Sequence, residues 1–109
     1  MFDLKRARNG QYSFTLKAEN GDVILNSQMY LAKKSAEAGI AMVQRNCQED
    51  ACYQRAQAAD GSFFFILNTV SKQILGKSVV HPNAESRDKG IERVKASGIT
   101  TNIRDMAPG

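Results

Sequence analysis

The two halves of the chain repeat one pattern of residues at an offset of 51 positions. The register runs without gaps, and the identical pairs include Gly10 with Gly61, Phe14 with Phe65, Leu16 with Leu67, Ser27 with Ser78, Ser35 with Ser86, Gly39-Ile40 with Gly90-Ile91, and Val43 with Val94. An internal repeat limits the possible architectures because it requires two copies of one supersecondary unit. We therefore expect a pseudo-two-fold arrangement, in which the repeats span about 1–50 and 51–101.

The two repeats are expected to share one hydrophobic core. Each has about fifty residues, and a chain that short buries too little surface to be stable by itself. The sequence shows no linker or low-complexity segment between them. Its composition, 42% hydrophobic and 24% charged, is typical of soluble domains. The sequence therefore predicts one domain, 1–109, whose residues 101–109 form a C-terminal strand or tail.

The first repeat is expected to form three strands and a helix. Asn9-Gly10 and Asn20-Gly21 are hairpin signals, because both residues of such a pair accept the positive φ of a type I′ turn. Between these turns, Tyr12, Phe14 and Leu16 alternate with polar residues, which predicts a strand with one buried face. The expected elements are strands at 2–7, 11–17 and 23–27, and a helix from 33 or 35 to about 44.

The second repeat follows the same plan. Asn83 is suited to cap the helix, because its side-chain oxygen can accept a hydrogen bond from the first turn. Gly98 is suited to end that helix. The expected elements are strands at 53–58, 63–68 and 74–78, a helix from 84 to about 96, and a short last strand within 99–105.

Glycine recurs in the middle of both predicted helices, as Gly39 and Gly90. A glycine inside a helix is less favourable than alanine by about 1 kcal/mol. Its recurrence indicates a steric reason. We expect each helix backbone to lie so close to the sheet that no Cβ fits.

The residues that usually carry chemistry are sparse. His81 is the only histidine, and its neighbours in the chain offer no carboxylate, so we expect a loop residue rather than a general base. Cys47 and Cys52 lack the further ligands of a zinc site, and the sequence leaves open whether they pair. No phosphate-binding glycine motif is present. The sequence therefore predicts no catalytic residue, cofactor or metal ligand, and a protein that is not an enzyme.

The segments NGQYSFTLKAENGDVI and SAEAGIAMV, with a serine near the end of the third strand, form a specific pattern. This pattern resembles the YegP-like family of small uncharacterised bacterial proteins, whose members carry the unit once or in tandem. The second repeat departs from it at Ser71-Lys72 and at His81, where the pattern has tyrosine. The resemblance implies an α+β fold of two β-β-β-α(-β) units in one mostly antiparallel sheet, with two helices on one face and exchanged terminal strands. It implies no activity.

An apolar run in the second repeat breaks the alternation of the first. Phe64 and Ile66 stand where the first repeat has Ser13 and Thr15, on the face opposite the core. If helices cover only one side of the sheet, these two side chains are exposed and a partner is expected there. The alternative is that the tail around 103–106 covers them. The sequence does not decide between the two.

Basic residues gather near the start of the chain, at Lys5, Arg6, Arg8 and Lys17. They are candidates for phosphate contacts along one edge of the sheet. Basic residues on an edge strand also discourage edge-to-edge aggregation. We favour this structural interpretation, because a net charge of +4 is small for a nucleic-acid-binding protein.

Two functional hypotheses follow. The first is a non-enzymatic interaction module, whose partner, another protein or a second copy of the chain, meets the open face of the sheet. The second is weak nucleic-acid binding through the basic edge. Salt separates them, because phosphate contacts weaken steeply with ionic strength and apolar contacts do not. The first ten residues, MFDLKRARNG, carry charges where a signal peptide is apolar, so we expect a cytoplasmic protein without membrane contact.

Overall fold

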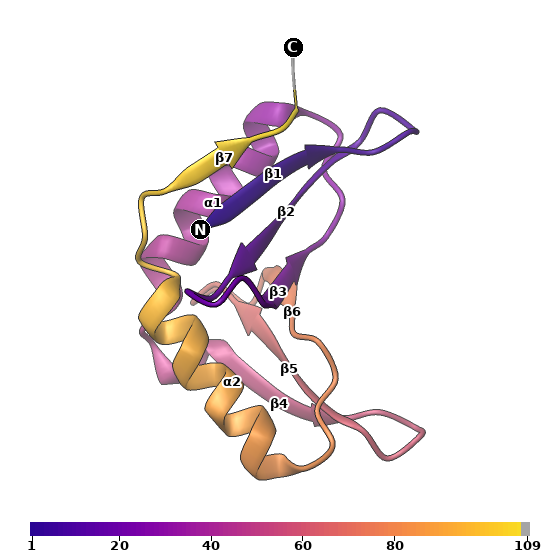
Figure 1. Cartoon of the computed structure of the whole chain (residues 1–109), viewed down its shortest axis with the longest axis vertical. Helices are drawn as coiled ribbons and strands as arrows, with labels where there is room; N and C mark the ends of the chain where they lie inside the picture. Colours follow the sequence, from indigo (N-terminus) through magenta and orange to yellow (C-terminus); the bar gives the residue numbers. More distant parts are fainter. Residues whose placement is uncertain (108–109) are drawn as a thin grey trace.

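The computed structural model describes residues 1–107, so the last two residues of the predicted tail, 108–109, lie outside the described residues. The elements are β1 (Phe2–Arg6), β2 (Tyr12–Lys17), β3 (Val23–Ser27), α1 (Lys33–Asn46), the 3-10 turn η1 (Asp50–Cys52), β4 (Tyr53–Gln57), β5 (Phe63–Asn68), β6 (Ile74–Lys77), α2 (Ala84–Ser97) and β7 (Ile103–Asp105). Their arrangement is seen in Figure 1. The strands and helices lie where the sequence predicts them, apart from shifts of a few residues at their ends.

All the strands join in one sheet, in the order β4-β5-β6-β3-β2-β1-β7. Neighbouring strands are antiparallel except β1 and β7, which are parallel. β3 and β6 pair at the centre, so the two halves of the chain share the sheet. β7 follows α2 in the second half yet pairs with β1 of the first. The expected α+β fold with a mostly antiparallel sheet is confirmed.

The two outer hairpins pair in the same register. Phe2 lies opposite Leu16 in the first hairpin, and Tyr53 lies opposite Leu67 in the second, 51 residues further on. The glycines of both turns have positive φ, 83° at Gly10 and 90° at Gly61. This backbone conformation is one that other residues rarely adopt. The hairpins lie where the sequence predicts them, but the expected type I′ turns are wrong: Asn9 and Asn20 do not have positive φ, and three residues separate the bonded Ala7 and Gln11. A two-residue type I′ turn at Asn9-Gly10 would pair Arg8 with Gln11 and shift the register by one residue.

Serines Ser27 and Ser78 extend the sheet beyond the ends of β3 and β6. The Phe14 N–H donates to Ser27 Oγ at 2.8 Å, and the Phe65 N–H donates to Ser78 Oγ at 3.0 Å. Each hydroxyl takes the place of a main-chain acceptor at the point where its strand ends. The repeated serines are thus structural residues of the sheet.

Both helices pack on one face of the sheet (Figure 1), where α1 contacts β1 and β2 and α2 contacts β5 and β3. The largest fully buried apolar side chains form a single core between the layers: Phe2, Phe14, Phe65, Leu4, Leu16, Leu25, Ile40, Leu67, Ile91, Val43 and Val94. Among residues 1–107, neither helix is long and apolar enough to cross a lipid bilayer.

The helix glycines lie against aromatic side chains, as the sequence predicts. A Cβ placed on Gly39 would lie 2.6 Å from Tyr30 Oη and 3.0 Å from Phe14 Cε2. A Cβ on Gly90 would lie 3.0 Å from His81 Nε2. The close approach therefore involves the loops before the helices as well as the sheet, and His81 occupies the place that Tyr30 has in the first half.

At the centre of the sheet the two halves differ. Leu25 of β3 is fully buried, and its counterpart 51 residues on is Gly76 of β6. A Cβ on Gly76 would lie 2.8 Å from the Asn26 carbonyl oxygen and 2.9 Å from Leu25 Cγ. Leu25 fills the space at the centre of the sheet, so a side chain at position 76 would overpack it.

Candidate interaction face

Seven side chains form a continuous row across the face that the helices leave open. Cross-strand pairing links them in the order Gln54, Ile66, Lys77, Asn26, Thr15, Asp3 and Arg104, one from each strand from β4 to β7. Directly paired residues lie on the same face of a sheet. The open face is therefore apolar near β5 and charged near β1 and β7.

The charged end of the row is a small ion cluster around Asp3. Its carboxylate has no exposed area and lies 2.9 Å from both Lys17 Nζ and an Arg104 guanidinium nitrogen. Burial raises the pKa of the Asp3 carboxyl, but the hydrogen bonds from Arg104 and Lys17 outweigh it, so the pKa lies below its ordinary value. These long side chains fold over the sheet and shelter the first half of the face.

The middle of the row contains an unusual buried hydroxyl. Thr15 is buried, and its Oγ1 has no hydrogen-bond partner among the described residues. A buried polar atom without a partner is unfavourable. The Thr15 hydroxyl therefore lies between the ion cluster and the apolar part of the face and forms a hydrogen bond with neither.

The apolar part of the open face consists of Ile66 in this row and Phe64, two residues earlier on β5, and both are half-buried. The Lys77 ammonium lies over the Phe64 ring, 4.4 Å from its centroid, which is a cation–π geometry. The alternative that the tail covers these residues is wrong: β7 lies beyond β1, and four strands separate it from β5. The apolar side chains are thus left to face solvent beside a lysine.

The four candidate basic residues do not line one edge of the sheet. β7 covers β1, so the strand that carries Lys5 and Arg6 is not an edge strand. Lys5 lies opposite Ser13 on the open face, whereas Arg6 points to the other face and lies 5.9 Å from the centroid of the Tyr12 ring. The other two are also apart, since Arg8 lies in the turn after β1 and Lys17 is paired with Asp3. The expectation of a single basic edge is corrected, because successive residues of a strand face opposite sides.

His81 packs against α2. Its Nδ1 lies 3.1 Å from Ser86 Oγ, and its ring lies close to Gly90. Burial lowers the pKa of the imidazole, and the nearby Arg93 and Arg87 guanidinium groups lower it further. A neutral ring that bonds a helix serine is consistent with a packing residue of the loop.

Cys47 and Cys52 are separate buried thiols. The Cys52 Sγ lies 3.8 Å from Asn46 Oδ1, and burial raises the pKa of the Cys47 thiol. The Tyr53 hydroxyl donates a hydrogen bond to the Cys47 carbonyl oxygen at the end of α1. These contacts hold the segment that connects α1 to β4.

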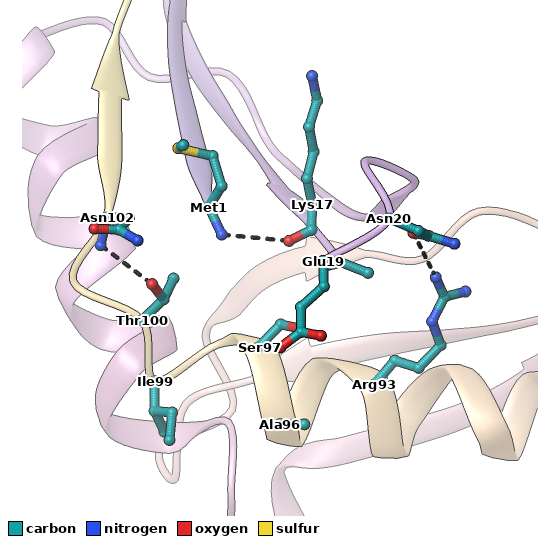
Figure 2. Close-up of a pocket in the computed structure, with 11 residues that line it drawn as sticks. Met1, Lys17, Glu19, Asn20, Arg93, Ala96, Ser97, Ile99, Thr100 and Asn102 are labelled. Carbon is teal, nitrogen blue, oxygen red and sulfur yellow. Dashed lines mark hydrogen bonds between the residues drawn. The ribbon is translucent and has the colours of Figure 1, made fainter.

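A hollow of about 690 Å³ lies between the start of β1, the β2–β3 turn and the end of α2 (Figure 2). Many of its polar groups bond to one another. The Met1 amine lies 3.3 Å from the Lys17 carbonyl oxygen, and Arg93 donates to Asn20 Oδ1 at 3.2 Å. Figure 2 also shows the Lys17 side chain directed away from the hollow. The residues that line this hollow come from both halves of the chain, and their bonds join the halves. Because these polar groups are already bonded, the candidate interaction face is the open side of the sheet.

Sequence reasoning did not single out Lys77, Asp3 or Arg104. The observed register places Asp3 diagonally across from Lys17. The expected type I′ turn at Asn9-Gly10 would instead pair Asp3 with Leu16, so it does not predict this contact. Arg104 reaches Asp3 from 101 residues away through the parallel β1–β7 pair, and local periodicity carries no signal for such a contact.

Comparison with known proteins gives relatives along nearly the whole chain. A domain family described as "Domain of unknown function (DUF1508)" matches residues 7–54. A UPF0339 protein of Acinetobacter baylyi is 45% identical over 105 residues, which cover 96% of this chain and 95% of the relative. The UPF0339 protein YegP of Escherichia coli (strain K12) is 40% identical over 104 residues, which cover 95% and 94%.

Two solution NMR structures have the same fold. The UPF0339 protein SO3888 of Shewanella oneidensis matches with a TM-score of 0.92 and 38% identity, over 97% of this chain and 90% of that one. E. coli YegP, described as a protein of unknown function, matches with a TM-score of 0.93 and 39% identity, over 99% and 93%. The descriptions of these two proteins name neither a substrate nor a partner.

Proposed function

We propose that this chain, which belongs to the UPF0339 family of YegP-like proteins, is a non-enzymatic interaction module that binds a partner protein through the open face of its sheet. One observation carries the proposal: Phe64 and Ile66 lie side by side on the face without helices, where the first half of the chain has Ser13 and Thr15. Apolar side chains that gather on an exposed face, with polar residues around them, are typical of protein–protein contact sites.

The charge of the face supports a partner with acidic residues. Lys5, Lys17, Lys77 and Arg104 lie on this side of the sheet, together with the carboxylate of Asp3. A second copy of the chain would bring two basic faces together, which is unfavourable. We therefore favour a different protein, one that places an apolar residue on Phe64 and Ile66 and carboxylates near Lys77 and Lys5.

Nucleic acid is the less favoured ligand for the same face. The Lys77 ammonium already occupies one side of the Phe64 ring, where a base would stack. Asp3 also neutralises part of the charge of Lys17 and Arg104. We further propose a cytoplasmic location, a compartment in which free thiols such as Cys47 persist.

Affinity capture with matched variants tests the proposal. The face variant is Phe64→Ser with Ile66→Thr, which installs the residues of the first half. Because both side chains are half-buried, we expect it to lose about 2 kcal/mol of folding free energy and to remain folded at low temperature. The control variant, Leu31→Thr with Val80→Ser, removes exposed apolar side chains from the loops before α1 and α2.

The immobilised proteins are incubated with nuclease-treated bacterial lysate at about 0.1 and 0.5 M salt, where phosphate contacts weaken steeply. The proposal expects a protein that the wild type and the loop variant both capture and the face variant does not. Capture that is equal for all three proteins would overturn it, as would the absence of any captured protein. Recovery of nucleic acid before nuclease treatment, lost at the higher salt, would favour the alternative.

A further inference from the structure

The two edges of the sheet are built differently, although the two halves of the chain follow one plan. β1 and β4 hold equivalent places in their hairpins, at the offset of 51 residues. β1 is covered by β7, whereas β4 is the last strand on its side. The second half therefore lacks, among the described residues, a strand in the position that β7 occupies beside the first.

Main-chain groups of β4 point to this vacant side. The Ala58 N–H donates to the Ser62 carbonyl oxygen at 2.7 Å, and the Phe63 N–H donates away from β4, to the loop before α2. Bonded pairs alternate along an antiparallel ladder. The N–H and C=O groups of Arg55 and Gln57 must therefore face outward, and both residues are exposed.

β1 shows how such groups are satisfied. The Phe2 N–H donates to the Asn102 carbonyl oxygen at 2.9 Å, and the Met106 N–H donates to the Leu4 carbonyl oxygen at 2.8 Å. β7 runs parallel to β1 with Ile103 beside Phe2. β7 is thus a short parallel strand that extends the hairpin of β1 and β2.

We propose that the outer edge of β4 binds an extended segment of a partner protein as an added parallel strand. The Tyr53 N–H is already bonded to the Asp50 carbonyl oxygen in η1. The available groups therefore begin at the Tyr53 carbonyl and continue through Arg55 and Gln57. Main-chain hydrogen bonds of this kind supply the affinity of strand addition, and side-chain contacts supply its specificity.

The side chains around the edge define the segment that fits. Arg104 of β7 lies opposite the buried carboxylate of Asp3. The residue of β4 that corresponds to Asp3 is Gln54, which is exposed and uncharged. The segment should therefore carry a neutral residue where β7 carries arginine. A second copy pairing β4 with β4 in full overlap would place Arg55 opposite Arg55, and like charges directly opposite are unfavourable.

This surface is distinct from the open face, and neither proposal rests on the other. The probe is a synthetic peptide with the sequence of residues 100–107 in which glutamine replaces Arg104. At a peptide concentration ten times the dissociation constant, about a tenth of the sites stay free, so amide exchange of Arg55, the residue equivalent to Leu4, should slow about tenfold. Exchange at Phe2 and Leu4 should not change, because β7 already pairs with them.

Two changes give matched controls. A peptide with proline in place of residue 104 lacks the N–H that would donate to the Tyr53 carbonyl, so it should protect nothing. Arg55→Pro removes the outward N–H that would donate to the peptide and costs no ladder bond, a position that tolerates proline, and it should weaken binding of the first peptide. The peptide control keeps the test valid if the protein variant fails to fold.

Unchanged exchange at Arg55 with about 1 mM peptide, a weak affinity, would overturn the proposal. Protection of Phe2 and Leu4 would overturn it too, since the peptide would then replace β7 rather than extend β4. Protection of Arg55 that rises with protein concentration in the absence of peptide, together with a dimeric mass, would assign the edge to a second copy and refute the chosen occupant.

Discussion

Replacing Gly39 by alanine sets two effects of known size against each other in α1. Helix propensity favours alanine over glycine by about 1 kcal/mol. The added Cβ would lie 2.6 Å from Tyr30 Oη and 3.0 Å from Phe14 Cε2, closer than such atoms approach, and overpacking of this kind costs about 1–3 kcal/mol. The Phe14 ring is fully buried. We therefore expect Gly39→Ala to lower the free energy of unfolding by about 1 kcal/mol, or roughly 5 °C in melting temperature.

Two companion variants separate the effects. Ala38→Gly, at an exposed position of the same helix, measures the propensity alone and should cost about 1 kcal/mol. Tyr30→Phe removes the closest atom, so the cost of Gly39→Ala should be smaller in that background. Urea denaturation gives each free energy. If Gly39→Ala stabilises the protein by as much as Ala38→Gly destabilises it, the close packing of α1 on Tyr30 and Phe14 is refuted.

Two further predictions concern the polar side of the sheet. Asp3→Asn should lower stability at neutral pH. The folded carboxyl has a depressed pKa, so its contribution to the free energy of unfolding is present above the unfolded pKa of about 3.9. This contribution is lost as the pH falls through the folded pKa. The melting temperatures of both proteins should therefore converge in acid, and a constant difference down to the lowest pH would contradict this. Thr15→Val should leave the free energy of unfolding unchanged or raise it by about 1 kcal/mol, because it removes a buried hydroxyl without a partner. A clear loss in urea denaturation would mean that the hydroxyl is bonded.

The repeat and the alternation of residues predict much of this fold. The offset of 51 residues places the hairpins in equivalent registers, and Asn83 caps α2 as expected, with its Oδ1 accepting from the Ser86 N–H at 2.7 Å. The parity of Phe65 also places Phe64 on the open face. These features follow from local geometry, because turn residues and side-chain alternation are properties of short segments.

The position of β7 could not be predicted in the same way. Alternation shows which face a residue takes, but it does not show which strand lies beside it. The pairing of Ile103 with Phe2 joins segments at opposite ends of the chain, and it converts the expected basic edge into an interior strand. The ion cluster of Asp3 with Arg104 depends on this pairing, so it was also beyond the reach of sequence reasoning.

The glycine at position 76, at the centre of the sheet, also could not be explained from the repeat alone. The register places it on Leu25, and a repeat alone would predict two similar side chains there. The two positions lie close together around the β3–β6 pair, so only one leucine fits. A repeat predicts the shared backbone plan, whereas packing near the axis requires the two copies to differ.

The most direct test of the central proposal, that the open face around Phe64 binds a partner protein, is site-specific photo-crosslinking. A photoreactive benzoyl-phenylalanine replaces Phe64 in one protein and the exposed Leu31 in another, and both are irradiated in nuclease-treated bacterial lysate. The proposal predicts a discrete protein adduct from position 64 that is absent from position 31. Excess wild-type protein should suppress this adduct, and excess Phe64→Ser, Ile66→Thr protein should not. Identical adducts from both positions, or none from position 64, would contradict the proposal.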